Sequence, residues 1–456
     1  MIESKIDVIR LTKNCLNYVE KINSNVKCAE IFFGKNKYIN IEIEENSVKN
    51  AEIGSDEGIS IRVIDKRGSL GFAYTNKLGK NPVQNMVKTA VKMMNAGVED
   101  IEFNNLPSQY SKYPNIKNIF DSNIKNLQIE DAVGYPEDLI KICEEDELAI
   151  SQSANFVSNY SKRYILNTNG IEISDKETFC SISSNIIVKD KIKNVTSFGY
   201  DWQSERSIKN IDAIKIAKNA LKDAKRNLNR IKTKSKKIPL ILTPKGTIGF
   251  ILSPIANAIN AETYQYKRSF LVDKRNEIIG SENLNIDDNA LLDGLAGSLP
   301  FDGEGVPCKN KKIIQNGKFL ELLHNSYTAG KEGVESTGNA SRSSYSSIPS
   351  IGISNFIMKA GDYSFEEIIN VKKGIILDYT GDSPNIATGD FSGLILHGNI
   401  IENGEIKEPL NETMFGINLL DLFKDIDAIS RETKTYGAYQ APYVRIKNVQ
   451  IIGSGS

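Results

Sequence analysis

Histidine is the scarcest ionisable residue in this chain, with His324 and His397 the only two among 456 residues. A zinc site built from several histidines is therefore excluded, and a proton relay through imidazole has only these two rings to use. Each histidine stands alone at the end of an apolar segment, beside small polar residues such as Asn325 and Asn399. We interpret both as structural, hydrogen-bonding residues at strand ends.

Cysteine is also sparse, and long apolar runs are missing. The five cysteines form no Cys-x-x-Cys pair, and an odd, scattered set is typical of reduced thiols in a cytosolic protein. No apolar run reaches the roughly 18 residues that a membrane helix needs. The N-terminus mixes acidic and basic residues from its third position, unlike a signal peptide. We therefore expect a cytoplasmic protein without a membrane segment.

Charge of one sign is not in excess, because lysine and arginine together number 57 and so do aspartate and glutamate. A balanced chain has no global attraction to nucleic acid or to an anionic membrane. One local run is basic, and it is either a nucleic-acid patch or a solvated helix end followed by a linker. We favour the linker because no aromatic residues interleave with the charges. The run consists of Arg226, Arg230, Lys232, Lys234, Lys236 and Lys237.

The chain is longer than one hydrophobic core usually serves, so we expect two domains. Placing the boundary in the basic run gives an N-terminal domain at residues 1–235 and a C-terminal domain at residues 236–456. In the first domain, apolar spacing predicts an opening helix at Ile2–Ile22 and separate strands at Ala29–Phe33 and Ile39–Ile43. An antiparallel meander follows over residues 151–204. The N-terminal domain is therefore expected to be a mixed α/β sheet.

The second half consists mainly of short apolar segments joined by glycine turns. Asn316-Gly317 and Asn403-Gly404 each lie between two such segments, and Asn-Gly is the strongest short-range signal for a β-hairpin. Many short strands with regular turns are typical of a barrel or a sandwich. We therefore predict an α+β protein with a mostly antiparallel β domain at its C-terminal end.

Four motifs together make this chain similar to a known family. They are Asp302-Gly303-Glu304-Gly305-Val306-Pro307, Ser336-Thr337-Gly338-Asn339, Gly389-Asp390-Phe391-Ser392 and Glu402-Asn403-Gly404-Glu405. The chain resembles the TldD/PmbA (TldE) family along nearly its whole length. The resemblance implies two related subunits, of which the TldD type carries a zinc-binding HExxxH helix and the PmbA/TldE type lacks it. The pair resembles a metalloprotease that takes unfolded peptides into a chamber and binds them as an added strand.

The resemblance assigns this chain to the metal-free type. In the helix at the matching position, Ser253, Pro254 and Ala258 stand where HExxxH has its histidine, glutamate and histidine. None of these side chains binds zinc well or acts as a general base on water. The TldD-type cysteine near the C-terminus is also missing, because residues 435–444 contain none. We expect no metal and no catalytic residue in this chain, with zinc in a TldD-type partner.

Within the stretch from Phe301 to Pro349, the composition suggests either a long flexible loop or a place where the backbone meets a ligand closely. We nominate Ser326, Tyr327, Thr337, Gly338 and Asn339 as the lining of a peptide groove, because small polar residues and an open strand edge suit main-chain capture of an extended peptide. The acidic segment Asp302, Gly303, Glu304 and Gly305 is either a carboxylate pair for metal or acid chemistry, or a structural loop, which we favour.

Two other functions remain open from the sequence. The chain is alternatively a stand-alone homodimeric peptide-binding protein, or a peptidase with a different nucleophile, such as Cys308 or Ser326. A thiolate–imidazole pair of Cys308 with His324 has no evident third group to orient it. The leading hypothesis is the non-catalytic subunit of a TldD/TldE-like metallopeptidase, paired with a TldD-type chain or with itself and binding unfolded peptides.

Overall fold

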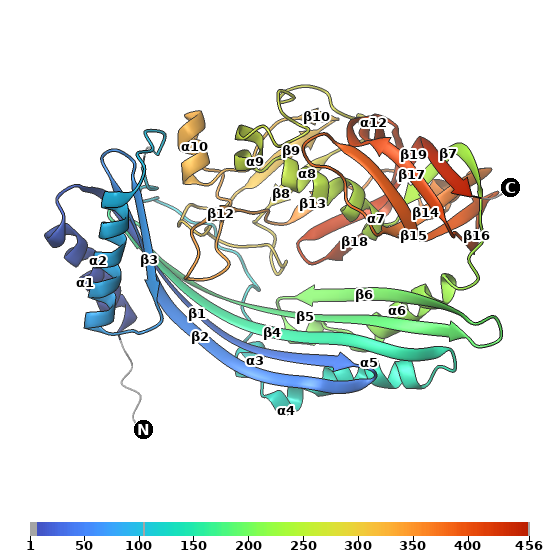
Figure 1. The fold of residues 1–456 in the computed structure, drawn as a ribbon, viewed down its shortest axis with the longest axis horizontal. Coiled ribbons are helices and arrows are strands. Elements are labelled where there is room, and N and C mark those ends of the chain that lie inside the picture. The colour runs from blue at the N-terminus through green and yellow to red at the C-terminus, as the bar shows by residue number, and fades with distance from the viewer. Residues whose placement is uncertain (1–6, 104, 455–456) are drawn as a thin grey trace.

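A long, curved sheet and a barrel lie against each other in the computed structural model, which describes residues 7–103 and 105–454 (Figure 1). The sheet comes from the N-terminal part of the chain and its concave side faces the C-terminal part. The fold is thus α+β, as predicted. Within the described residues, no helix is both long and apolar enough to cross a membrane.

The N-terminal sheet has six antiparallel strands in the order β3-β2-β1-β4-β5-β6. The prediction of separate strands at 29–33 and 39–43 was wrong, because both belong to the single 19-residue strand β1. The polar segment between them, residues 34–38, interrupts the apolar alternation but pairs without a break with β2. The strands are β1 (Val26–Glu44), β2 (Ser47–Asp65), β3 (Leu70–Thr75), β4 (Ala149–Asn167), β5 (Glu172–Asp190) and β6 (Val195–Glu205).

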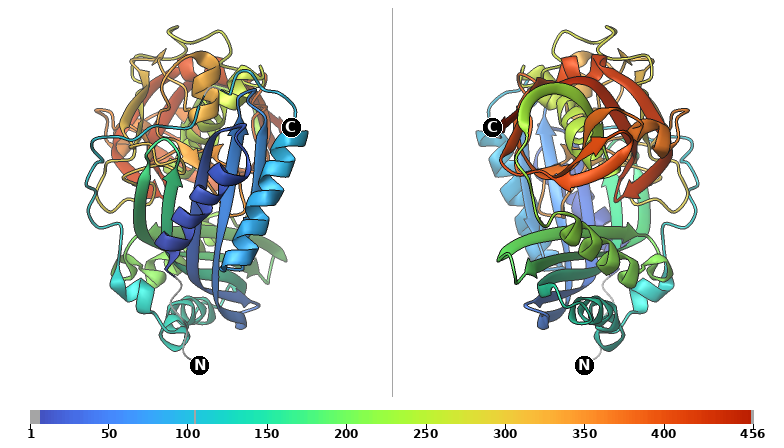
Figure 2. Two further views of the ribbon diagram at one scale, coloured as in Figure 1. Left: turned by 90° about the vertical axis from the view of Figure 1, so that its left-hand side faces the viewer. Right: turned by 90° about the vertical axis from the view of Figure 1, so that its right-hand side faces the viewer.

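Helices cover the convex face of this sheet at both ends (Figure 2). Side chains alternate between the two faces of a strand, so the odd-numbered Ile31 and Ile41 of β1 both pack against helices. The even-numbered positions of β1 point to the concave side. The predicted opening helix is α1, and Ile2 and Ile6 lie outside the described residues. The helices are α1 (Val8–Ile22), α2 (Lys80–Ala96), α3 (Ser122–Asn126), α4 (Ile129–Ala132), α5 (Gly134–Glu144), η1 (Ile208–Asn210) and α6 (Ala213–Arg226).

The C-terminal sheet closes into a five-stranded barrel, because β19 pairs with β7 as well as with β17. Both Asn-Gly hairpins form as predicted, with left-handed backbone at Asn316, Gly317, Asn403 and Gly404. The barrel strands are β7 (Lys234–Leu242), β14 (Lys373–Thr380), β15 (Asp390–Glu402), β17 (Thr413–Asn418) and β19 (Tyr439–Ser454). The other strands are β8 (Ile286–Asn289), β9 (Asn310–Gln315), β10 (Lys318–Phe319), β11 (Ala340–Ser341), β12 (Ser350–Ile351), β13 (Phe356–Met358), β16 (Glu405–Pro409) and β18 (Ile426–Tyr436).

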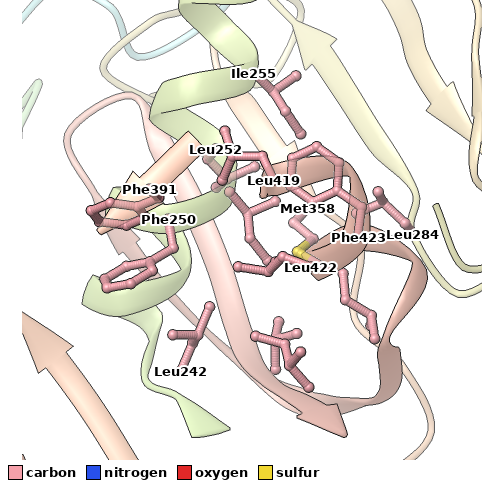
Figure 3. Close-up of a cluster of buried hydrophobic side chains, with 14 of the residues drawn as sticks. Leu242, Phe250, Leu252, Ile255, Leu284, Met358, Phe391, Leu419, Leu422 and Phe423 are labelled. Atoms are coloured by element: carbon pink, nitrogen blue, oxygen red, sulfur yellow. The ribbon is translucent and has the colours of Figure 1, made fainter. Parts of the chain in front are cut away.

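A helical segment at residues 244–258 supplies much of the barrel's core. It contains a π-helical turn, η2, between two α-helical pieces. Phe250 of this turn lies 4.8 Å from the Phe391 ring and 5.3 Å from the Phe415 ring (Figure 3). The helices of this half are α7 (Pro244–Thr247), η2 (Ile248–Leu252), α8 (Ser253–Ala258), α9 (Ala261–Gln265), α10 (Ser326–Glu332), α11 (Phe365–Ile369) and α12 (Leu419–Lys424).

Ion pairs and aromatic contacts join the N-terminal half to the barrel. Lys245 of α7 reaches Asp201 of β6 at 3.1 Å and Asp223 of α6 at 3.2 Å. Arg226, the first residue of the basic run, pairs with Asp378 of β14. The ring of Trp202 lies 4.5 Å from that of Tyr436. Part of the basic run is therefore a contact between the two halves of the chain.

Candidate functional site

The loop after Phe301 is organised by the carboxylate of Asp302. Its Oδ1 accepts hydrogen bonds from the backbone N–H of Glu304 at 2.8 Å and of Val306 at 3.0 Å. Its Oδ2 accepts one from Ala340 at 2.9 Å, which ties the loop to β11. Burial and the neighbouring Glu304 charge raise the pKa of Asp302 to about 7, although these N–H donors oppose the shift. The Asp302 carboxylate therefore holds the turn at residues 302–306 together and connects it to β11.

Glu304 belongs to a buried ion network with the N-terminal sheet. Its Oε1 lies 2.8 Å from Arg62 of β2, and Arg62 also reaches Glu30 of β1 at 3.1 Å. Arg342 pairs with the same Glu30. Burial raises the pKa of a carboxyl group, but Arg62 and hydrogen bonds from Ser326 hold the pKa of Glu304 below its usual value. Two acids are thus matched by two bases across the two halves of the chain.

Two of the five nominated groove residues make fixed contacts at the start of α10. The Ser326 hydroxyl donates to Glu304 Oε1 at 2.6 Å, and its backbone N–H donates to Oε2 at 2.7 Å. The Tyr327 hydroxyl donates to Asp100 at 2.7 Å, and its ring is stacked on Phe103. Both side chains hold α10 against the N-terminal half.

The other three nominated residues lie together in a buried hydrogen-bonded group. Thr337 donates to Asn339 Oδ1 at 2.8 Å, and Lys311 reaches the same oxygen at 2.9 Å. Asn339 Nδ2 donates to Asp288 at 2.9 Å. Gly338 has φ +72°, and a Cβ there would come within 2.7 Å of the Pro307 carbonyl oxygen, so glycine is required. This group shapes the floor of a cavity.

A polar cleft lies between the N-terminal sheet and the loops of the C-terminal half. Its volume is about 450 Å³, within the range of ligand sites. Gly338 and Asn339 line it, as do Asp302 and Gly303, whereas Ser326, Tyr327 and Thr337 do not. The sequence analysis did not nominate the other lining residues, which include Gly34, Asn36, Asn159, Ser161, Arg163, Ser341, Ser344 and Tyr345.

One signal for part of this site is present in the sequence. Glu30 and Arg62 each stand inside an apolar run, next to Ile31 and Ile61, where a charged residue needs a buried partner. The asparagines and serines of β4 carry no such signal. They occupy the ordinary polar positions of an alternating strand, and only the packing of the C-terminal half over them creates the cleft.

Cys308 and His324 do not form a nucleophile–base pair. The Cys308 thiol donates to the Gly338 carbonyl oxygen at 3.4 Å, and burial raises its pKa to about 12. His324 Nδ1 lies 3.2 Å from the Thr328 hydroxyl, and burial lowers the pKa of the ring. A protonated thiol and a neutral imidazole with other partners do not activate each other.

Family models match this chain in three consecutive segments. They are described as PmbA/TldA metallopeptidase domain 1 at residues 29–94, the central domain at residues 122–228 and the C-terminal domain at residues 235–453. An uncharacterized protein of Methanocaldococcus jannaschii is 31% identical over 87% of this chain and 90% of its own length. The chain belongs to the PmbA/TldD family.

Other relatives of this PmbA/TldD-family chain span its full length. A metalloprotease PmbA homolog of Buchnera aphidicola is 27% identical over 99% of this chain and 98% of its own. The crystal structure of TldE from Thermococcus kodakarensis has a TM-score of 0.85 at 23% identity and covers 97% of this chain and 100% of its own. A putative modulator of a DNA gyrase from Thermotoga maritima has a TM-score of 0.87 at 21% identity, with the same two shares. At these identities the two crystal structures show a shared fold.

The sequence analysis predicted that the HExxxH motif of TldD-type members would stand at α8 of this PmbA/TldD-family chain. Pro254 and Ala258 are buried apolar residues there, and Ser253 is in hydrogen-bond contact with the Tyr439 hydroxyl. Among the described residues, no three histidine, cysteine, aspartate or glutamate side chains are grouped so as to hold a metal ion. The side chains at α8 therefore do not fit zinc, whose ligands are nitrogen, sulfur and carboxylate oxygen.

Proposed function

We propose that this chain is the non-catalytic, PmbA/TldE-type subunit of a TldD/TldE-like metallopeptidase. It binds extended, unfolded peptides in the cytoplasm, and a TldD-type partner carries the zinc and the hydrolytic chemistry. The observation that carries this proposal is the composition of α8, where Ser253, Pro254 and Ala258 offer no good zinc ligand. The metalloprotease names of the relatives support a role in proteolysis.

The cleft supplies the peptide-binding role in this proposal. Its lining is rich in glycine, serine and asparagine, and these residues offer hydrogen bonds without selecting a charged side chain. The two-stranded ribbon β11–β12 contributes Ala340 and Ser341 to the wall. A peptide aligned with this ribbon is held mainly through its backbone, which makes binding tolerant of sequence. Gly338 and Asn339 of the nominated groove lie at its floor.

Partner association explains how such a chain takes part in hydrolysis. A zinc ion in the partner lowers the pKa of a bound water and polarises the peptide carbonyl. The residues of this chain position the peptide and exclude solvent beside that site. Related subunits often use one surface for self and for sibling association, so the isolated chain is expected to be a homodimer.

Mixing the purified chain with a TldD-type chain from the same cell tests the proposal. Alone, the chain is expected to contain no stoichiometric zinc by mass spectrometry and to leave an unfolded peptide uncleaved. The mixture is expected to cleave that peptide, and a chelator is expected to stop the cleavage. Tightly bound zinc in the isolated chain would overturn the subunit assignment.

The same assays identify the two other functions. Peptide binding by a homodimer that never associates with a TldD-type chain indicates a stand-alone binding protein. Cleavage by the isolated chain that Cys308→Ala or Ser326→Ala abolishes indicates a peptidase with that nucleophile. The buried thiol of Cys308 and the Glu304-bound hydroxyl of Ser326 both argue against this third function.

A further inference from the structure

Two glycines face each other on the concave side of the N-terminal sheet. Gly34 of β1 is paired in register with Gly58 of β2. Because neither glycine has a side chain, the pair leaves a depression on this face of the sheet that can hold one aromatic ring. Phe32 lies beside Gly34, since a Cβ added there would be 3.2 Å from its ring. We call this depression, with Phe32 and Tyr74 at its borders, the glycine socket.

Tyr345 fills the glycine socket. A Cβ at Gly58 would come within 2.3 Å of the Tyr345 ring, so the ring lies directly on the backbone of β2. Its edge meets Tyr74 of β3, with 6.2 Å between ring centroids. The hydroxyl donates to Asp56 at 3.0 Å in an exposed position. The glycine socket therefore offers an aromatic ring two kinds of contact, which are the Tyr74 ring and, for a hydroxyl group, the carboxylate of Asp56.

Tyr345 lies in the turn between β11 and β12, two paired strands of the C-terminal half. The base of this hairpin is fixed, because Arg342 donates to the carbonyl oxygens of Gly303 and Ser347. The tip is a turn whose other hydrogen bonds are local, including Ser347 to Ser344 at 2.9 Å. None of these hydrogen bonds involves the Tyr345 side chain.

The position of the socket connects it to the cleft. Tyr345, Gly34 and Phe32 all line the 450 Å³ cavity in which the proposed function places an extended peptide. In the proposed function, a peptide aligned with β11–β12 reaches the turn that carries Tyr345. A side chain of the same shape as Tyr345 would find the same ring contact with Tyr74 and the same hydroxyl acceptor on Asp56.

We propose that the glycine socket is a subsite for an aromatic side chain of the bound peptide, and that Tyr345 is an internal occupant which that side chain displaces. The inference rests on the proposed peptide-binding function. It adds a preference for tyrosine or phenylalanine at one position to a site that otherwise holds the backbone. It also makes Tyr345 an autoinhibitory residue, since every aromatic peptide must first replace it.

Fluorescence anisotropy with two labelled peptides tests the subsite on the full-length chain. One peptide is a glycine–serine decapeptide with a central tyrosine, and the other has serine at that position. Tyr345→Ala is expected to bind the tyrosine peptide about tenfold more tightly than the wild type does, the gain of seating one ring without a competitor. Tyr345→Phe keeps the ring but loses the hydrogen bond to Asp56. Its affinity for the tyrosine peptide is expected to lie between those of the wild type and Tyr345→Ala.

A second change separates the socket from a general loosening of the hairpin. In the double variant Tyr345→Ala with Gly58→Val, the valine fills the socket, and the tyrosine peptide is expected to lose its advantage over the serine peptide. Tyr363→Ala, an exposed tyrosine outside the cleft, serves as the matched control and is expected to behave as wild type. Circular dichroism of each variant verifies that it is folded.

The outcomes distinguish this inference from the function on which it rests. Equal binding of the two peptides by Tyr345→Ala, or a tyrosine preference that survives Gly58→Val, overturns the subsite and leaves peptide binding intact. Failure of both peptides to bind the wild type and every variant overturns the proposed function, and the subsite with it.

Discussion

At the scale of single residues, the cleft depends on charges that are buried in matched pairs. Arg62 is the centre of this arrangement, because it contacts Glu30 and Glu304 at once. Removing one member of a buried network leaves its partners charged in a medium of low dielectric constant. The same residues join the N-terminal sheet to the loop that Asp302 organises, so the network also sets the shape of the site.

Arg62→Leu is expected to lower the free energy of unfolding by about 3–5 kcal/mol, because the buried Glu304 loses the guanidinium that pairs with it and Glu30 is left with Arg342. Urea unfolding followed by circular dichroism measures this. Lys35→Met is the control, since its pair with Glu57 is 2.7 Å long but 42% exposed at both side chains. An exposed pair contributes less than about 1 kcal/mol. Equal effects of the two substitutions would contradict the role given to the buried network.

His397 gives the protein a pH dependence. Burial lowers its pKa from 6.5 to about 4, and the ring lies 4.3 Å from the ring of Phe198 of the N-terminal sheet, with 44° between the ring planes. Between those two pH values the unfolded chain binds more protons than the folded chain, so the stability contribution of the neutral ring is lost as pH falls. His397→Gln is expected to reduce this loss. Unfolding free energies measured from pH 7 to pH 4 give the difference, and parallel curves for the two proteins would contradict the assignment.

At the scale of secondary-structure elements, the hairpins are set by backbone conformation. Gly317 adopts φ +73°, and a Cβ there would come within 2.2 Å of the Gly280 carbonyl oxygen. Gly437 has φ +59° with open space around it, and Gly416 has neither constraint. Substitution of these three glycines therefore tests backbone strain and steric overlap separately, because Gly317 has both, Gly437 has only the positive φ and Gly416 has neither.

A graded series of alanine substitutions follows from these three positions. Gly416→Ala is expected to be near neutral, and Gly437→Ala to cost about 1 kcal/mol for the left-handed backbone. Gly317→Ala is expected to cost more than both, since the hairpin β9–β10 must also move away from Gly280. Thermal unfolding of the three variants gives the order. A Gly317→Ala protein as stable as Gly416→Ala would show that this turn adjusts freely.

At the scale of the whole molecule, the two halves of the chain meet through a polar junction. Lys245 is held between Asp201 and Asp223, and it lies over the Trp202 ring at 5.8 Å. Trp202 is the only tryptophan of the chain, so its fluorescence reports on the junction alone. The cleft lies between the same two halves, and its width therefore depends on this contact.

Lys245→Met is expected to weaken the junction, because it leaves Asp201 and Asp223 without their shared cation. Tryptophan fluorescence should then change at a lower urea concentration than circular dichroism, whereas the two transitions should coincide in the wild type. Lys222→Met is the control, because Lys222 is an exposed lysine that lines the same cavity as Lys245, and the two transitions should stay coincident in this variant. Coincident transitions in Lys245→Met would show that the junction does not depend on this lysine.

Local patterns in the sequence were enough to predict the α+β class, the two Asn-Gly hairpins and a barrel-like C-terminal half. Asn316-Gly317 and Asn403-Gly404 determine their turns through their own backbone preferences, and apolar alternation determines which face of a strand is buried. The family motifs were likewise readable from the residues in order. These features depend on neighbours a few positions apart.

Only the tertiary structure decided the site. The polar residues 34–38 read as a break between two strands, yet pairing with β2 makes them the middle of one strand and part of a cleft wall. Tyr345 and Gly58 are 287 positions apart, and no local pattern connects a serine-rich turn with a glycine in a strand. Burial and contact depend on which distant segments pack together, so the cleft, the ion network around Arg62 and the glycine socket exist only in the folded chain.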